Sequence, residues 1–345
     1  MSIRVVVVDD SAFMRKIISD KISQIKGIDV CGIARDGQSA LKMIEKQQPD
    51  VITLDIEMPG LNGLETLKII KERFNIPVIM LSSHSGEDMT ITSLELGAMD
   101  FIEKPQNLLK IEADFVAELE LKIKSISKAN VLLTETKSVQ SPLTDNNEAV
   151  FPKKIRAIVI GASTGGPRAL MQLIKYIPAD LRIPILIVQH MPAGFTTSFS
   201  KRLNQEAQVP VVEAVDSELI QGGKVYIAPG NHHLRLEDGR IKLGSPEEAK
   251  VHGVRPAVDY LFETAAQCYQ KELVGIILTG MGNDGTAGLR VIKELGGYTI
   301  AQDQKSSVVF GMPRRAIESH VIDEIGNLEE IGERLNWMIR VKQWR

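Results

Sequence analysis

Short apolar runs alternate with longer segments of helical periodicity through the first third of the chain. The runs predict strands at Arg4–Val8, Val30–Ala34, Val51–Asp55, Pro77–Ser82 and Asp100–Glu103. The segments between and after them place apolar residues on one helical face and predict helices at Ala12–Ile25, Gln38–Lys46, Leu64–Arg73, Glu87–Leu96 and Ile111–Ile126. Strands that alternate with helices are typical of a doubly wound parallel sheet. We therefore expect a flavodoxin-like α/β domain over residues 1–127.

The pattern of apolar positions weakens after Ser127. Residues 128–152 are rich in Thr, Ser, Asn and charge, which is typical of a linker. Beyond them the alternation returns and predicts a second α/β domain over residues 153–345. Its expected strands are Ile155–Ile160, Ile183–Gln189, Val209–Ala214, Lys224–Ala228, Leu273–Thr279 and Tyr298–Gln302.

One segment of this second domain has the alternation of a hairpin. Apolar and polar residues alternate from Leu234 to Leu243 on both sides of Asp238 and Gly239, a pair that favours a tight turn. We expect a doubly wound, mostly parallel sheet with this antiparallel hairpin added.

Composition excludes several classes of protein. The 345 residues are 43% hydrophobic and carry a formal net charge of -3, so the chain has neither the composition of a disordered protein nor a broad basic surface. No apolar stretch approaches the ~18 residues of a membrane span, and the N-terminus lacks the pattern of a signal peptide. We expect a cytoplasmic protein that binds no nucleic acid and inserts into no membrane.

Acidic residues stand where strands of the first domain end. Asp9 and Asp10 end the first strand, Asp55 the third and Ser82 the fourth, and Lys104 follows the fifth. The carboxyl ends of parallel strands meet at one edge of the sheet, so these side chains should lie together. Clustered carboxylates favour a hard divalent cation such as Mg²⁺. The metal and a lysine would neutralise an incoming phosphoryl group while a carboxylate attacks it. Solvated strand ends are the alternative.

The first domain resembles the receiver domain of two-component response regulators. The resemblance rests on Val7 to Ser11, on Leu54 to Gly60, and on Lys104 with Pro105. It implies a phosphoacceptor at Asp55, a Mg²⁺ site at Asp9, Asp10, Asp55 and Glu57, and a switch formed by Ser82, Phe101 and Lys104.

A serine stands in a glycine-rich turn at the start of the second domain. Gly161 to Gly165 fit the pattern G-x-S-x-G directly after the apolar run Ile155–Ile160, which makes Ser163 a candidate nucleophile. The motif by itself leaves two alternatives open. It is also compatible with a turn that has only a packing role, or with a degraded dinucleotide fingerprint, although a serine at the middle glycine position argues against NAD.

Two further strand ends supply the partners that a nucleophilic serine needs. His190 follows the apolar run Ile185–Val188, and Asp284 lies in the glycine-rich segment after Leu273–Leu278. The three residue types match a nucleophile, a base and a carboxylate that orients the base. Their order, Ser then His then Asp, differs from that of α/β hydrolases, in which the histidine comes last.

The second domain is similar to the catalytic domain of the CheB family of chemotaxis methylesterases. The similarity rests on Gly161 to Pro167, Gln189 to Pro192 and Thr279 to Gly285. It implies hydrolysis of glutamate γ-methyl esters on chemoreceptors, deamidation of selected glutamines, and activation by a chemotaxis histidine kinase through phosphorylation. It also implies Ser163, His190 and Asp284 as catalytic residues, with oxyanion support at Thr164 and Met281. We expect no cofactor in this site, and a monomer.

Two alternative functions stay open for the second half. A nucleic-acid-binding output domain would place a basic helix-turn-helix in a short second half, whereas this half is long and α/β and lacks a basic recognition helix. A silent adaptor that binds receptors would not need the catalytic side chains.

His232 and His233 are adjacent and would point to opposite faces of a strand, so we expect loop structure or substrate contact rather than joint metal binding. His252, Arg255 and Pro256 are candidates for the edge of the active site, with a surface position as the alternative.

Overall fold

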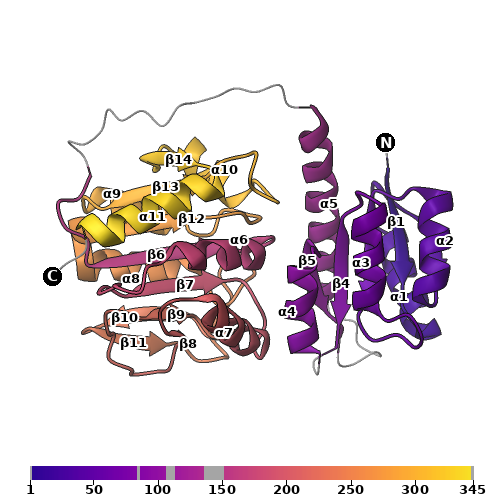
Figure 1. The fold of residues 1–345 in the computed structure, drawn as a ribbon, viewed down its shortest axis with the longest axis horizontal. Helices are drawn as coiled ribbons and strands as arrows, with labels where there is room; N and C mark the ends of the chain where they lie inside the picture. Colours follow the sequence, from indigo (N-terminus) through magenta and orange to yellow (C-terminus); the bar gives the residue numbers. More distant parts are fainter. Residues whose placement is uncertain (1, 84–85, 106–112, 136–150, 343–345) are drawn as a thin grey trace. The chain divides into compact units, whose positions relative to one another are not determined.

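The computed structural model describes residues 2–83, 86–105, 113–135 and 151–342. The chain divides into two compact units, Met1–Thr136 and Lys137–Arg345, and each is described by itself (Figure 1). This division agrees with the expected pair of α/β domains, while the functional boundaries at residues 127 and 152 stay a prediction.

The first unit is a five-stranded parallel sheet in the order β2-β1-β3-β4-β5. Its elements are β1 (Ile3–Val8), α1 (Ala12–Ser23), β2 (Ile28–Ala34), α2 (Gly37–Gln47), β3 (Val51–Asp55), α3 (Gly63–Arg73), β4 (Val78–Ser82), α4 (Glu87–Glu95), β5 (Asp100–Glu103) and α5 (Ala113–Glu135). The strands β3 and β4 are buried along their whole length, as expected for strands covered by helices on both faces. The flavodoxin-like fold is confirmed.

Polar caps fix where the helices of this unit begin. The Ser11 hydroxyl accepts a hydrogen bond from the Met14 backbone N–H at 3.3 Å and starts α1 directly after Asp9 and Asp10. Asn62 and Glu65 form a capping box at the start of α3, where each side chain accepts the other's backbone N–H. These caps begin α1 and α3 after the carboxyl ends of β1 and β3, at the sheet edge that carries the acidic residues.

Helix α5 is longer than the sequence pattern predicts. We expected it to end at Ile126, but it continues to Glu135 and so enters the expected linker. The segment after Ser127 includes Val131, Leu132 and Leu133, which are good helix formers or are tolerated in helices. The remainder of the expected linker up to Val150 lies outside the described residues.

The second unit is built on a seven-stranded parallel sheet in the order β14-β13-β12-β6-β7-β9-β8. Its strands are β6 (Ala157–Ala162), β7 (Ile185–Gln189), β8 (Val211–Glu213), β9 (Val225–Ile227), β10 (Leu234–Glu237), β11 (Arg240–Leu243), β12 (Leu273–Ile277), β13 (Tyr298–Gln302) and β14 (Glu324–Gly326). Its helices are α6 (Gly166–Leu173), η2 (Ile174–Tyr176), α7 (Phe195–Glu206), α8 (Val258–Tyr269), η3 (Gln270–Glu272), α9 (Thr286–Glu294), α10 (Met312–Glu318) and α11 (Leu328–Lys342).

The expected antiparallel hairpin is present as a small sheet of its own. Strands β10 and β11 pair from Leu234 with Leu243 to Glu237 with Arg240. Asp238 and Gly239 both have a positive φ, 47° and 73°, as a tight two-residue hairpin turn requires.

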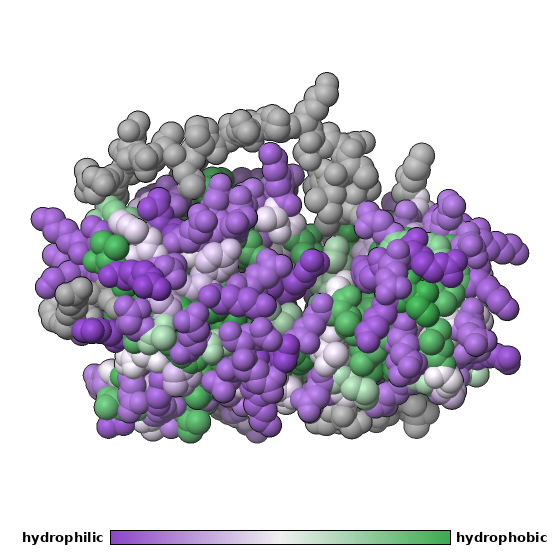
Figure 2. All heavy atoms as spheres, viewed as in Figure 1, coloured by the Kyte–Doolittle hydropathy of each residue, from purple (hydrophilic) through white to green (hydrophobic). Residues whose placement is uncertain are grey.

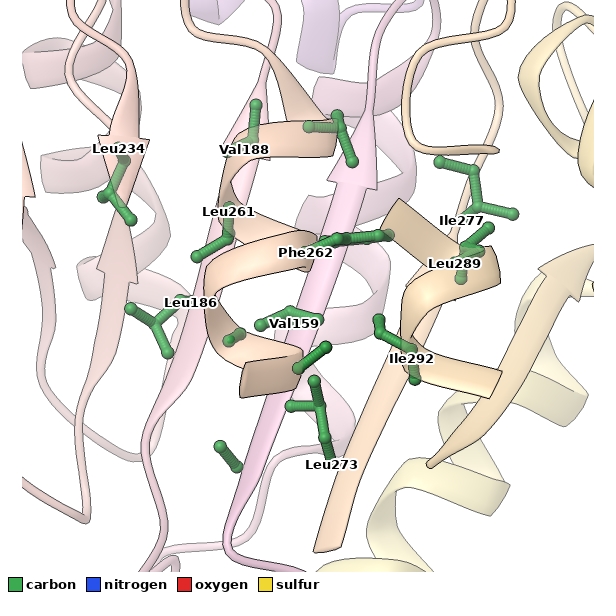
Figure 3. Packing of buried hydrophobic residues seen from close by; sticks show 14 of the residues in the cluster. Val159, Leu186, Val188, Leu234, Leu261, Phe262, Leu273, Ile277, Leu289 and Ile292 are labelled. Carbon is green, nitrogen blue, oxygen red and sulfur yellow. The ribbon is translucent and has the colours of Figure 1, made fainter. Parts of the chain in front are cut away.

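A hydrophobic core fixes α8 and α9 against one face of the central strands (Figure 3). Leu261 and Phe262 of α8 and Leu289 of α9 are fully buried in this cluster, over Val159 of β6 and Ile277 of β12. Burying a side chain of this size contributes about 2–3 kcal/mol. The N-termini of both helices are therefore held beside the carboxyl ends of β6 and β12.

The outer surface of both units is largely hydrophilic in the view of Figure 2. Within the described ranges, none of the helices combines the length and the apolar character that crossing a bilayer requires.

Candidate functional site

The acidic residues of the first unit meet at one edge of its sheet, as their strand-end positions predicted. Lys104 Nζ lies 2.8 Å from Asp9 Oδ2 and 2.7 Å from Asp55 Oδ2. Both carboxylates are buried, while Asp10 beside them is exposed. One ammonium group therefore bridges two buried carboxylates and leaves the cluster with net negative charge.

Burial changes the acidity of the central carboxyl. Burial is the largest cause and, with the negative charge of Asp9, raises the pKa of Asp55 to about 6 against the opposing charge of Lys104. Ionising Asp55 in the folded protein therefore costs free energy. A bound cation would lower this cost, because its positive charge favours the ionised carboxylate.

A cation fits the described carboxylates. Asp9, Asp10 and Asp55 each offer an oxygen, and these oxygens lie within 4.8 Å of one another. Three carboxylate oxygens at such spacing suit Mg²⁺. The Glu57 carboxylate is not part of this group: it accepts a hydrogen bond from the Ser83 hydroxyl at 3.3 Å.

The expected switch residues are enclosed in the first unit. The Ser82 hydroxyl is 2.6 Å from that of Thr90 on α4, and Ser82 also donates to the Ser83 carbonyl. The Phe101 ring is buried, with the Lys122 ammonium 5.4 Å from its centroid. Sequence reasoning missed Thr90 and Lys122, because only the packing of α4 and α5 brings them to the strand ends.

Ser163 stands at the turn between β6 and α6 in the second unit. Gly165 has a φ of 76°, which a side chain would disfavour, and permits the sharp turn into the helix. The Ser163 N–H donates to the Thr279 carbonyl at 3.0 Å, which ties the turn to the end of β12. A Cβ added at Gly280 would lie 2.7 Å from that of Ser163, so only glycine allows this approach. The half-buried Ser163 is thus fixed from two strands.

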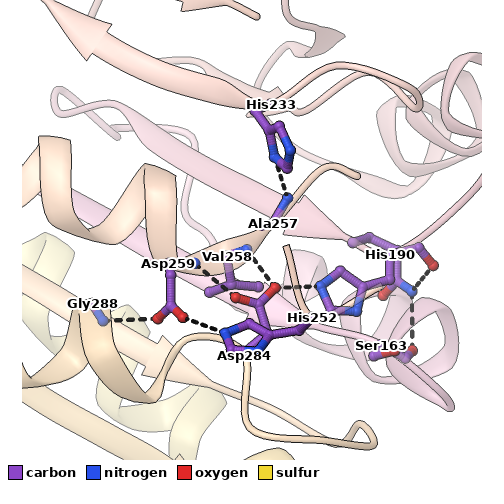
Figure 4. A network of polar contacts seen from close by, with 10 residues as sticks. Ser163, His190, His233, His252, Ala257, Val258, Asp259, Asp284 and Gly288 are labelled. Atoms are coloured by element: carbon purple, nitrogen blue, oxygen red, sulfur yellow. Dashed lines mark hydrogen bonds and ion pairs between the residues drawn. The ribbon is translucent and has the colours of Figure 1, made fainter. Parts of the chain in front are cut away.

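Strand register brings His190 beside Ser163. Strands β6 and β7 are parallel, with Ala162 opposite Gln189, so the next residue of each chain follows at the same sheet edge. His190 Nε2 lies 2.8 Å from Asp284 Oδ2, and Figure 4 shows the His190 ring between Asp284 and Ser163. With Nε2 bound to the carboxylate, Nδ1 is the ring nitrogen left to accept a proton.

The Ser163 hydroxyl makes no hydrogen bond to His190 among the described residues. Nucleophile and base are often apart in structures without substrate and approach only in the complex. The structure thus brings together the three predicted side chains and completes the His190–Asp284 half of the arrangement.

Asp284 is held by the first turn of α8. Its carboxylate accepts the Val258 N–H at 2.7 Å and the Asp259 N–H at 3.0 Å, two donors that a helix N-terminus leaves unpaired. Burial alone would raise the pKa of this carboxyl. The hydrogen bond and charge of His190, with the two N–H groups, instead hold the pKa of Asp284 below its usual range.

Several residues that support the site were not foreseen. Gln189 Nε2 donates at 3.0 Å to the carbonyls of both Ser163 and His190. The Thr279 hydroxyl donates to the Thr164 carbonyl at 2.9 Å, and the Thr279 N–H donates to Gln302 Oε1 at 2.7 Å. Gln189 does fall in a motif quoted above, Gln189 to Pro192, but nothing in that pattern tells where its amide points.

The two residues expected to support an oxyanion lie at the same edge. Thr164 is buried at the start of the turn into α6, and Met281 is half-buried in the loop after β12. Their role stays a prediction.

The histidine pair before β10 is part of the structural frame. His233 is fully buried: its Nδ1 accepts the Ala257 N–H at 3.1 Å, and its Nε2 lies 3.0 Å from the Ala249 carbonyl. His232 Nδ1 instead contacts the Gly244 carbonyl at 2.8 Å. The two rings have different partners, so they do not act jointly.

His252 and Arg255 lie on the loop that leads into α8. His252 Nε2 is 3.1 Å from Asp259 Oδ2, and Arg255 is bound by the Asn231 side chain and the Glu248 carbonyl. Atoms of His252, Asp259 and Asp284 lie within 4.8 Å of one another, the spacing of a cation site. Hydrogen bonds already engage all three, so we assign no metal to them.

The folds and the side chains define a class of protein: a response-regulator receiver joined to an α/β hydrolytic unit. The family model "Response regulator receiver domain" matches residues 5–115, and the model "CheB methylesterase" matches residues 158–335. The chain belongs to the CheB methylesterase family.

Known relatives extend over nearly the whole chain. The "Protein-glutamate methylesterase/protein-glutamine glutaminase" of Pyrococcus horikoshii is 44% identical over 96% of this chain and 92% of its own length. The protein of the same name from Thermotoga maritima is 43% identical over 96% and 97%. The crystal structure of the Thermotoga maritima CheB methylesterase catalytic domain has a TM-score of 0.51 and 41% identity, and covers 54% of this chain and 100% of its own.

Proposed function

We propose that this protein hydrolyses glutamate γ-methyl esters on chemoreceptors and deamidates selected receptor glutamines, through Ser163, His190 and Asp284. The names of the full-length relatives support the substrate class. The single observation that carries the mechanism is the 2.8 Å contact of His190 with buried Asp284, at the sheet edge where Ser163 follows β6.

The reaction follows from which nitrogen of His190 is engaged. Asp284 accepts a hydrogen bond from the Nε2–H, so Nδ1 takes the proton of the Ser163 hydroxyl as its oxygen attacks the ester carbon. The backbone N–H groups at Thr164 and Met281 are our candidates to stabilise the oxyanion. His190 then returns the proton to the leaving methoxide, and methanol departs. Water hydrolyses the acyl-enzyme by the same steps, and an amide substrate releases ammonia instead.

Methanol release from methylated receptor tests this mechanism. Ser163→Ala should lower the rate by at least about 10³-fold, because the nucleophile is gone. Ser319→Ala is a matched control, since Ser319 lies at the end of α10. Wild-type release by the Ser163 variant would remove the serine mechanism. Absence of release from wild type and variant alike would favour the receptor-binding adaptor.

We further propose that a chemotaxis histidine kinase phosphorylates Asp55 and so activates the esterase. Asp9, Asp10 and Asp55 would hold Mg²⁺, and the metal supplies charge neutralisation for phosphoryl transfer when bound. Lys104 contacts Asp55 at 2.7 Å and is placed to bind a phosphoryl oxygen. Ser82 and Phe101 are our candidates for the element that changes state.

The domain boundaries and the oligomeric state are also part of the proposal. We assign the receiver to residues 1–127, the linker to 128–152 and the esterase to 153–345, in a monomer. Sedimentation of the full chain with and without phosphorylation tests the monomer: a mass that doubles in either state would contradict it.

A further inference from the structure

Two aspartates of the second unit bind the first turn of each other's helix. Asp284 precedes α9, and its carboxylate accepts the N–H groups of Val258 and Asp259 at the start of α8. Asp259 lies in the first turn of α8, and its Oδ1 accepts the Gly288 N–H at the start of α9 at 2.8 Å. Each carboxylate therefore satisfies donors that the other helix leaves unpaired.

Each of these aspartates also has a histidine partner (Figure 4). His190 Nε2 is 2.8 Å from Asp284 Oδ2, and His252 Nε2 is 3.1 Å from Asp259 Oδ2. The two carboxylates come within 4.8 Å of each other. Two like charges so close repel, and the two helix N-termini with the two histidines offset that repulsion.

Close packing leaves this arrangement little freedom. A Cβ at Gly285 would lie 2.9 Å from Val258, and one at Gly161 would lie 2.4 Å from the same side chain. A Cβ at Gly288 would lie 2.4 Å from Phe262. The start of α8 thus touches both the strand that leads to Ser163 and the helix that follows Asp284, so a shift of α9 against α8 would move Asp284 away from His190.

The charged groups that interact with Asp259 come from three parts of this unit. Asp284 lies on the loop before α9, His252 on the loop before α8 and Glu263 on α8 itself. Beyond them, His190 contacts Asp284, and Arg235 of β10 acts on Glu263. Burial raises the pKa of Asp259, and Asp284 adds to this, while the Gly288 N–H and His252 oppose it. Burial likewise raises the pKa of Glu263, with contributions from both aspartates.

We propose that Asp259 is a positioning residue of the esterase site. Through Gly288 it clamps α9 so that Asp284 meets His190, and its negative charge, paired with His252, favours the protonated form of His190 that the reaction requires. This role rests on the proposed function of Ser163, His190 and Asp284. Asp259 touches neither the nucleophile nor the base, and it acts through Asp284 and the two helix starts.

Two variants of the full chain separate the geometric effect from the charge. Asp259→Asn keeps an oxygen for the Gly288 N–H but removes the charge, whereas Asp259→Ala removes both. The pKa of His190 is read by NMR titration of labelled histidines, assigned with His190→Gln, and methanol release is measured against pH. Glu294→Gln, an exposed carboxylate at the far end of α9, is the matched control.

We expect Asp259→Asn to lower the His190 pKa, and the acid limb of kcat/KM with it, by about half a pH unit or more. Asp259→Ala should add a loss on the order of 10-fold in kcat with KM nearly unchanged, because Asp284 is misplaced. Its Tm should fall by about 2–4 °C for the lost cap. Glu294→Gln should change none of these quantities.

Two results would overturn the proposal. If both variants lower only the Tm and leave the His190 pKa at its wild-type value, Asp259 is merely structural; if neither variant differs from wild type, it has no role. The NMR titration needs no turnover and so separates this inference from the proposed function. Full methanol release by Ser163→Ala would reject the serine mechanism while leaving the effect of Asp259 on His190 measurable.

Discussion

At the scale of single residues, Asp55 is ionised in the folded receiver at a cost. Its pKa is raised from 3.8 to about 6, so the folded state binds a proton more tightly than the unfolded state does. The cost is complete above pH 6, shrinks as the pH falls from 6 to 3.8, and is absent below 3.8. The shift corresponds to about 2–3 kcal/mol of lost stability at neutral pH.

Asp55→Asn should therefore stabilise the receiver in EDTA at pH 7.5 by up to this amount. Scanning calorimetry of the full chain measures it, and the transition that Mg²⁺ shifts in wild type identifies the receiver. The gain in stability should vanish near pH 3.5. It should become smaller when Mg²⁺ is added, because the metal gains the Asp55 carboxylate as a ligand only in the wild type. An equal gain at every pH would contradict the electrostatic cause.

The hydrogen bonds of Gln189 predict that this residue affects the rate of catalysis. Its amide donates to the carbonyls of Ser163 and His190 and so links the nucleophile turn to the base. Gln189→Met keeps the length of the side chain but removes both donors. We expect kcat for methanol release to fall on the order of 10-fold with KM nearly unchanged. Gln172→Met on the exposed face of α6 is the control, and an equal loss in both variants would refute the assignment.

The catalytic candidates could be predicted from the sequence because they follow strands, whereas the partners of the supporting side chains could not. Ser163, His190 and Asp284 each follow an apolar run, and strands in one parallel sheet bring such residues to one edge. Asp259 follows no such run, and its importance depends on how α8 meets α9. The Thr279 contact to Thr164 likewise joins residues 115 positions apart in the sequence.

At the scale of elements, His233 fixes where α8 begins. Its Nδ1 accepts the Ala257 N–H directly before the helix, so the ring must be neutral there. Burial, the largest cause, lowers the pKa of His233 below 6.5. The folded state resists protonation, so the stability due to the neutral ring is complete above pH 6.5. It is lost as the pH falls below 6.5 toward the folded pKa.

The stability of the second unit should therefore fall with pH below 6.5, and His233→Gln should flatten that slope. At pH 8 the variant should be less stable by about 1–2 kcal/mol, because the buried ring loses its hydrogen bonds and its contact with Tyr260. Urea unfolding followed by tryptophan fluorescence reports it, because both tryptophans of the chain, Trp337 and Trp344, belong to the second unit. His320→Asn, at an exposed position with positive φ that asparagine tolerates, should keep the wild-type slope. Parallel slopes in all three proteins would contradict the assignment.

Element prediction succeeded where apolar runs were continuous and failed where they were short. Buried strands such as β3, β7 and β12 were foreseen because both of their faces are covered. Strand β14 has only three residues, one of them exposed, and carries too little pattern to identify. No range was predicted above for helix α11, which buries Leu335 and Met338 on one side.

At the scale of the whole molecule, a receiver and an esterase are separate compact units of one chain. The esterase unit is self-contained, because the core around α8 and α9 and every described contact of the Ser163 site lie within it. Phe151, at its start, packs against Tyr298 with 4.6 Å between ring centroids and against Trp337 with 5.2 Å. A fragment that keeps Phe151 should therefore fold alone, as the solved catalytic domain of the relative supports.

A fragment of residues 137–345 should hydrolyse methylated receptor faster than the unphosphorylated full chain, if the unphosphorylated receiver holds the esterase in a less active state. Phosphorylation replaces the single negative charge of the Asp55 carboxylate by a charge of about -2 and would favour the more active state. A tenfold activation needs only about 1.4 kcal/mol of difference between the two states. A small acyl phosphate with Mg²⁺ should therefore activate the full chain but neither the fragment nor full-length Asp55→Asn, which should keep the basal rate. A fragment no faster than the unphosphorylated chain would reject inhibition by the receiver, because removing an inhibitory unit must raise the basal rate.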